Sequence, residues 1–323
     1  MEKLFYSPTE FPSPSHSVSI QAAIDAAVKT DIRTVVIPKG EWYLDKTVYL
    51  PEVITVIIDG ASVHSKKTAF KNSNADNPQT KSLGGEESAI FIIGFRGAVL
   101  SSDDQSPEIY LSNVKEFKIS GLTFAGGGLE LNFARYGRVD KLKFEGSRFG
   151  LILSEGCNNN IISDIIARTE GFAVEFRGKE SYMFGRGLEM AENIINRVKS
   201  ECSSAVKISS GPCETYNIII KDVICLADAP AVVIGDEKDT FTPLDITVRG
   251  VESKGTSVKV VTDCDGLFVS EASGKAELSK PIVRCLIDEK KATYSPPLLR
   301  NITRKSSLPQ MIAVSSEAVM QRR

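Results

Sequence analysis

Two runs of the same form, GLELN at Gly128–Asn132 and GLILS at Gly150–Ser154, decide the fold, because four similar runs follow them. These are AVEFR from Ala173, AVKIS from Ala205, AVVIG from Ala231 and SVKVV from Ser257. The second residues of successive runs are separated by 22, 23, 32, 26 and 26 residues. A repeat of roughly 20 to 50 residues is typical of a solenoid. The sequence therefore predicts stacked coils, one for each run.

The alternation within the runs predicts which side chains point inward. Side chains of a strand alternate between its two faces. The second and fourth residues of all six runs are apolar, and we expect them to stack inside: Leu129 and Leu131, Leu151 and Leu153, Val174 and Phe176, Val206 and Ile208, Val232 and Ile234, Val258 and Val260. The third residues should form an outward row: Glu130, Ile152, Glu175, Lys207, Val233 and Lys259.

Other β-rich runs, such as RVDKLKFEGSRF and NIISDIIAR, lie between the repeats, and no crossover helices separate them. Two or three short strands per coil favour an all-β fold, a single-stranded right-handed parallel β-helix. A β-sandwich is the competing interpretation. The helical spacing of apolar residues in SVSIQAAIDAAVKT predicts a short helix that caps the open end of the solenoid.

We expect one domain over residues 1–323. It would consist of a capping helix at 17–30, coils over 31–285, and a tail or second cap at 286–323. The polar stretch at 65–87 predicts an excursion from the stack, and such loops carry function more often than the core does.

Composition narrows the classes of partner and location. The 39 basic and 41 acidic residues nearly balance, which gives no electrostatic footprint for nucleic acid or an anionic membrane. No stretch has the length and apolarity of a membrane span, and the opening MEKLFYSPTEFPSPSHS lacks the apolar run of a signal peptide. We expect a cytoplasmic protein, or a secreted one if a leader has been removed.

The six cysteines have no spacing typical of a zinc site, and the only histidines, His16 and His64, are near the N-terminus. We expect reduced cysteines that fill small core positions, and no metal or cofactor.

The candidate site lies on the outward row of the middle coils. Glu175, Arg177 and Lys207 should gather there, with Glu155 and Glu170 at the neighbouring strand ends. Glycosidic cleavage needs two carboxylates, so the three glutamates are candidates for acid and base, and the two cations are candidates for binding a sugar carboxylate. The alternative is a solvated face, with Glu175 and Lys207 as a cross-strand ion pair.

The insertion SYMFGRGLEMAE lengthens the coil beside this cluster. Tyr182 and Arg186 would suit the wall of a sugar groove, because aromatic rings pack on sugars and arginine binds carboxylates through two hydrogen bonds. The insertion could equally pack down on the solenoid as a small core of its own.

The chain resembles a known family. SIQAAIDAA followed by TVVIPKGEWYL is similar to the opening of pectin-lyase-like β-helix proteins. The run ARYGRVDKLKFEGSRFGLILSEGCNNNIISDIIARTEGFAVEFRG resembles the central coils of polygalacturonase-like proteins, which are glycoside hydrolase family 28-like. The resemblance implies hydrolysis of galacturonate-containing polysaccharide by inversion, with aspartates at strand starts, a nearby histidine and an Arg-x-Lys pair for the substrate carboxylate.

This sequence departs from the family at each of those positions. Phe149 stands at the first aspartate, TEGF from Thr169 replaces the Asp-Asp pair, Ser204 stands at the histidine, and Val233 and Gly235 replace the Arg-x-Lys pair. Two functions therefore stay open. One is a carbohydrate-active β-helix, a hydrolase of uronate-containing oligosaccharides with its own catalytic residues. The other is an inactive sugar-binding or assembly module, of which a tailspike-like trimer is the weaker form; the sequence does not indicate an oligomeric state.

Overall fold

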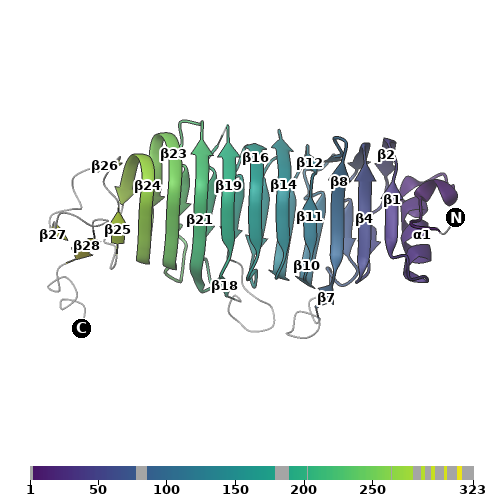
Figure 1. Ribbon diagram of the computed structural model, residues 1–323, viewed down its shortest axis with the longest axis horizontal. Coiled ribbons are helices and arrows are strands. Elements are labelled where there is room, and N and C mark those ends of the chain that lie inside the picture. The colour runs from purple at the N-terminus through teal and green to yellow at the C-terminus, as the bar shows by residue number, and fades with distance from the viewer. Residues whose placement is uncertain are drawn as a thin grey trace.

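The computed structural model describes residues 3–77, 86–178, 189–201, 203–262 and 264–278, and four short strands beyond them. Parallel strands stack side by side along one long axis, and helix α1 (His16–Val28) closes the N-terminal end (Figure 1). The chain is a parallel β-helix, as the sequence predicts. Within the described ranges, no helix has the length and apolarity needed to cross a membrane.

Each coil contributes to three ladders of strands, which we call A, B and C in the order in which the chain visits them. Ladder A contains β1 (Thr34–Ile37), β4 (Ile54–Asp59), β8 (Ile90–Phe95) and β11 (Lys118–Ser120). Ladder B contains β2 (Gly40–Leu44), β5 (Ala61–Ser65), β9 (Val99–Ser102) and β12 (Thr123–Phe124).

Later coils merge the first two ladders. The longer strands run through ladder A and continue into ladder B: β14 (Arg138–Glu145), β16 (Ile161–Arg168), β19 (Ile194–Ser200), β21 (Thr215–Cys225), β23 (Leu244–Val260) and β24 (Asp265–Leu278). The final short strands are β25 (Cys285–Ile287), β26 (Ala292–Tyr294), β27 (Ile302–Thr303) and β28 (Met311–Val314).

Ladder C holds the six repeats of the sequence. Its strands are β3 (Val48–Leu50), β6 (Phe70–Asn72), β10 (Ile109–Lys115), β13 (Leu129–Arg135), β15 (Leu151–Ser154), β17 (Val174–Arg177), β20 (Val206–Ser209) and β22 (Val232–Ile234), followed by the end of β23. Two short strands, β7 (Glu87–Ser88) and β18 (Met190–Ala191), pair beside it with β10 and β21.

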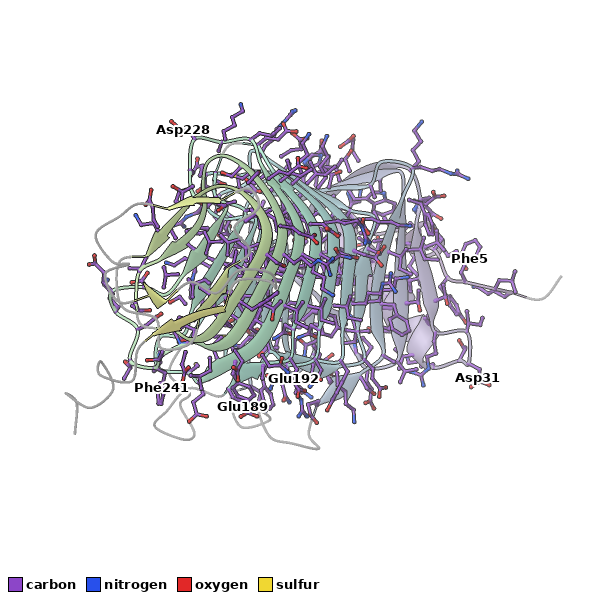
Figure 2. The ribbon with its side chains drawn as sticks, turned by 60° about the vertical axis from the view of Figure 1, so that its left-hand side comes forward. Phe5, Asp31, Glu189, Glu192, Asp228 and Phe241 are labelled. Atoms are coloured by element: carbon purple, nitrogen blue, oxygen red, sulfur yellow. The ribbon has the colours of Figure 1, made fainter. Side chains whose placement is uncertain are left out.

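The predicted inward register is confirmed. Leu151 pairs with Leu129 and Val174, and Val174 pairs with Val206, in one row of side chains with no exposed surface. Figure 2 shows the coils nested around this shared interior. The described cysteines also lie as expected, because Cys157, Cys213, Cys225 and Cys264 are all buried in the core.

The corners of the coils stack as regularly as the strands. One row of residues with φ of 48° to 57° stands ahead of ladder A: Val53, Ala89, Glu116, Tyr136, Asn159, Glu192, Asn217 and Asp245. A second left-handed row separates ladders A and B: Lys141, Asp164, Arg197, Asp222, Gly250 and Glu271. A non-glycine residue in this region costs about 1 to 2 kcal/mol, so packing of each coil on its neighbours must hold these corners in place.

The N-terminal segment forms hydrogen bonds with backbone groups at the open edge of the first coil, on all three ladders. Tyr6 pairs with β1 through its backbone, and His16 Nδ1 accepts from Tyr43 N of β2 at 2.8 Å. The Gln21 amide binds both backbone groups of Tyr49 in β3, at 2.8 and 3.1 Å. The predicted cap is therefore confirmed, with Ser15 as its N-cap residue.

A candidate site on the outer face of ladder C

The outward row predicted from the repeats exists. Strand pairing places Glu130 beside Ile152, Ile152 beside Glu175, and Glu175 beside Lys207. Coils repeat at about 4.8 Å, so Glu130 and Glu175, two coils apart, have Cα atoms roughly 10 Å from each other. The row carries three charged residues over four coils.

Glu175 is not a solvated residue. Its carboxylate accepts a hydrogen bond from Arg177 Nη2 at 2.5 Å, and the glutamate side chain is only 11% exposed. The Arg177 side chain keeps 43% of its surface exposed. A buried carboxylate thus anchors a guanidinium group that still faces solvent.

Lys207 forms an ion pair with a residue that lies outside the repeated runs. Its Nζ bonds Asp236 Oδ2 at 2.6 Å and lies 5.4 Å from the centre of the Phe172 ring. The hydrogen bond from Lys207 lowers the pKa of Asp236. The cross-strand pair between Glu175 and Lys207, considered from the sequence, is replaced by two separate ion pairs.

A second group of carboxylates lies on the N-terminal side of this pair. Burial raises the pKa of Tyr110 to about 12, and Glu130 and Glu155 add to the rise through their negative charge. Ser154 Oγ lies 3.5 Å from Glu130 Oε1, and Glu155 directly follows Ser154 at the end of β15. Glu155 is almost fully buried. Glu130 and Glu155 therefore belong to one neighbourhood, beside Glu175.

Glu170 lies apart from this neighbourhood. It is exposed in the turn that leads into β17, where its N–H donates to the Ser147 carbonyl at 3.2 Å. Glu155 follows the end of the adjacent strand β15, so the two residues lie at opposite ends of neighbouring strands. Of the three predicted catalytic residues, Glu175 and Glu155 are brought close to the outward row. Tyr182 and Arg186 lie outside the described residues.

Sequence reasoning did not select Glu130 or Asp236 as site residues. Glu130 stands on the predicted outward row two coils from Glu175, so the alternation alone could have found it. Asp236 follows β22 in an irregular segment, held by Asp239 Oδ2, which accepts from the Asp236 N–H at 2.9 Å. The repeat carries no signal for that position. In the ranges described, no three His, Cys, Asp or Glu side chains converge in a way that could hold a metal ion.

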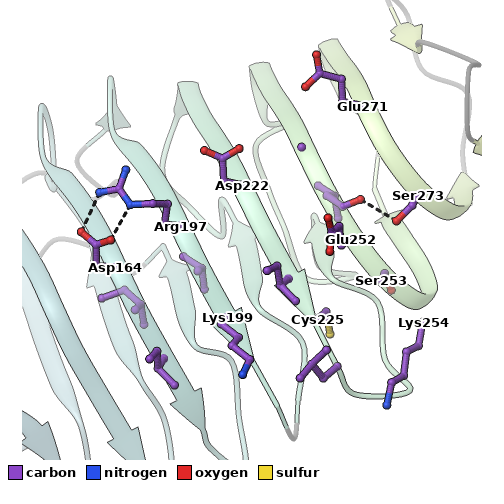
Figure 3. A pocket seen from close by; sticks show the side chains of 17 residues that line it. Asp164, Arg197, Lys199, Asp222, Cys225, Glu252, Ser253, Lys254, Glu271 and Ser273 are labelled. Carbon is purple, nitrogen blue, oxygen red and sulfur yellow. Dashed lines mark hydrogen bonds and ion pairs between the residues drawn. The ribbon is translucent and has the colours of Figure 1, made fainter.

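A groove of about 1030 Å³ runs along ladder B, away from all the predicted site residues (Figure 3). Asp164, Arg197 and Asp222 line it from the second row of corners, and Lys199 and Glu252 line it from β19 and β23. Of its lining residues that the structure describes, none is aromatic. The groove therefore lacks the rings on which sugars usually pack.

The stacked coils and three ladders define the class of the protein, a parallel β-helix. No protein-family model and no curated protein matches the sequence. Solved structures do match it in fold. The chain is similar to PfbA, a surface adhesin of Streptococcus pneumoniae, with 12% identity, a TM-score of 0.61, and coverage of 96% of this chain and 100% of that one.

Two enzymes have a comparable likeness. One is named 1,3-α-1,4-β-D-galactose-4-sulfate-3,6-anhydro-D-galactose-2-sulfate 4 galactohydrolase, with 11% identity, a TM-score of 0.58, and coverage of 77% of this chain and 72% of that one. The other is the family 28 exopolygalacturonase of Yersinia enterocolitica, with 11% identity, a TM-score of 0.53, and coverage of 92% and 79%. Likeness at this identity establishes the fold alone.

Proposed function

We propose that this protein is a carbohydrate-active β-helix that binds a uronate-containing oligosaccharide over the middle coils of ladder C. The observation that carries the proposal is the Arg177 guanidinium group, anchored on the buried Glu175 carboxylate and open to solvent. Arginine binds carboxylates through paired hydrogen bonds, and anchoring reduces the entropy lost when it does so. A sugar carboxylate carries the charge opposite to that of the Arg177 guanidinium group.

The surroundings suit a sugar chain rather than a single small anion. Lys207 lies one coil beyond the Glu175–Arg177 pair and supplies a second cation, with the half-buried ring of Phe172 beside it. Cations and a ring on successive coils follow the axis of the solenoid, as an extended chain of sugars would. The glycoside hydrolases of the same fold, named above, support a carbohydrate ligand.

Binding is tested by titration with trigalacturonate at low salt. Arg177→Ala should weaken binding about tenfold or more, because hydrogen bonds to charged groups are worth about 1.5 to 3 kcal/mol. Arg138 is the matched control, since it too pairs with a carboxylate two residues away on its strand, Asp140 at 2.6 Å. Arg138→Ala should leave the affinity unchanged. Equal affinities for the Arg177 variant and the parent protein would reject the site.

Hydrolysis is the stronger form of the proposal, with Glu175 and a second carboxylate, Glu130 or Glu155, as acid and base. Inverting enzymes hold their two carboxyls about 6.5 to 9.5 Å apart. The two-coil spacing puts the Cα atoms of Glu130 and Glu175 roughly 10 Å apart, just above that range, and a small inclination of the side chains toward each other brings the carboxyls within it. Glu175→Gln should lower reducing-end release from oligogalacturonate by roughly 10² to 10⁴-fold. Glu145→Gln, a change in an ion pair of ladder B, is the control.

The non-catalytic alternative also has an observation in its favour. The Glu175 carboxylate is already engaged with Arg177, and Lys207 with Asp236, as in a rigid binding surface. A parent protein that binds trigalacturonate and releases no reducing ends, with or without Glu175, would establish the binding module.

A further inference from the structure

Ladder B begins at β2, next to the capping helix α1 (Figure 1). Three polar side chains from its first three coils meet on the outer face. Register pairs Tyr43 of β2 with His64 of β5, and His64 with Ser101 of β9. Glu41 lies two residues before Tyr43 on the same strand and so shares its outward face. This group is separate from the ladder C site.

The contacts join Glu41, His64 and Ser101 in a line. His64 Nε2 lies 2.6 Å from Glu41 Oε2, and His64 Nδ1 lies 2.8 Å from Ser101 Oγ. A carboxylate only accepts hydrogen bonds, so with a neutral imidazole the proton sits on Nε2. Nδ1 then accepts the hydrogen bond from the Ser101 hydroxyl. The carboxylate fixes the tautomer in which the imidazole is the base of the serine.

The imidazole ring is also held in its plane. It stacks on the Tyr43 ring with centroids 5.1 Å apart and planes inclined by 21°. His16 of the capping helix stacks near Tyr43 in turn, at 6.3 Å and 25°, and bonds the Tyr43 N–H. The stacked rings favour the orientation in which His64 faces the serine.

Ser101 is partly exposed, and the coil on its far side from His64 presents small residues. The next coil places Ala125, which is exposed, directly after Phe124, the partner of Leu100. Ala125 has no side chain beyond Cβ, and Gly126 follows it. An acyl compound can therefore reach Ser101 from solvent beside small residues, while the rings occupy the opposite side.

We propose that Ser101 is an activated nucleophile for small acyl esters, with His64 as its base and Glu41 as a positioning residue. Ser101 Oγ attacks the ester carbonyl carbon and its proton passes to His64 Nδ1. The alcohol leaves with that proton, and an acyl-serine remains. Water, deprotonated by the same imidazole, then hydrolyses the acyl-serine and releases the carboxylic acid. Nucleophile, base and orienting carboxylate within hydrogen-bond reach are the arrangement that such chemistry requires.

The first test uses p-nitrophenyl acetate on the full chain. Release of p-nitrophenol should fall by roughly 10² to 10⁴-fold in Ser101→Ala and in His64→Gln, the range for loss of general-base catalysis. Thr123→Ala, which removes a hydroxyl from the same face one coil further along, should keep the parent rate. Glu41→Gln should slow acylation and shift its pH profile, and Glu41→Asp should recover part of the rate.

The second test identifies the labelled residue. Incubation with a fluorophosphonate, followed by digestion and mass spectrometry, should place the adduct on Ser101 in the parent protein and nowhere in His64→Gln. Circular dichroism checks that each variant is folded. Equal ester cleavage by the parent and Ser101→Ala, or an adduct absent from Ser101, would overturn the proposal. The outcome is independent of sugar binding, because no ladder C residue takes part.

Discussion

Glu108 is a carboxyl group enclosed in the turn that leads into ladder C. Its two oxygens accept from the N–H groups of Gly127 and Gly128, at 3.1 and 2.5 Å, and the residue has no exposed surface. A Cβ at position 127 would lie 1.9 Å from the Ser106 carbonyl oxygen, so only glycine permits this close turn. Burial raises the pKa of Glu108 to about 7, against the opposing effect of the backbone donors.

This group should make stability fall as pH rises across neutrality. The pKa is higher in the folded state than the ordinary 4.5, so the stabilisation is fully present below about pH 4.5 and is lost as pH rises through 7. The loss is about 2.5 kcal/mol between pH 5 and pH 8, at 1.36 kcal/mol per pKa unit. Urea unfolding at both values measures it. Glu108→Gln should remove the difference, and an equal slope in that variant would contradict the assignment.

Some residues of the candidate site could be predicted from the sequence, and others are located only by the structure. Glu175 and Lys207 could be located from the sequence because the two-residue alternation of a strand fixes their direction. Asp236 could not, since the segment after β22 has no period and its contacts decide its course. The burial of Glu175 could not be predicted either. Strand alternation predicts the face toward which a side chain points, but not how far the neighbouring side chains cover it.

At the scale of an element, α1 shows how a repeat protein ends. Its buried face, Ile20, Ala23, Ile24 and Ala27, packs across β1, β2 and β3. Polar side chains from the same helix meet the backbone groups that the first coil would otherwise turn to solvent. The helix therefore both covers the core and occupies the free edges.

Ile24→Ala should destabilise the protein by about 2 to 5 kcal/mol, the usual cost of truncating a fully buried isoleucine. Val18 is the control on the same helix, since it is 47% exposed, and Val18→Ala should change the free energy of unfolding by less than about 0.5 kcal/mol. Urea unfolding of both variants is the measurement. Similar losses in the two would mean that the helix does not bury the core as described.

The helix and the strands could be predicted from their spacing, but the corners could not. Asparagine or aspartate marks some left-handed corners, as at Asn159, Asp164 and Asn217, and these residues tolerate that conformation. Val53 and Ala89 occupy the same row with no such preference. Their conformation is imposed by the coils on either side, and a local pattern does not contain that information.

At the scale of the whole molecule, one scaffold carries two unrelated faces. Ladder C displays the Glu175–Arg177 pair in the middle of the stack, and ladder B displays His64 and Ser101 near the capped end. A continuous apolar interior lies between them, so a change on one face should leave the other undisturbed. Each proposed activity can therefore be removed singly.

The register of ladder C also determines how the molecule yields to force. Each strand is bonded only to the coil before and the coil after it, so tension on the two termini should detach coils one at a time. The interval from Leu129 to Leu151 is 22 residues and that from Val174 to Val206 is 32, which correspond to about 8 and 11 nm of extended chain. Optical tweezers should record a series of extension steps of unequal length. The longest step should come from the coil that contains the insertion. A single rupture of full length would mean that the stack breaks as one body.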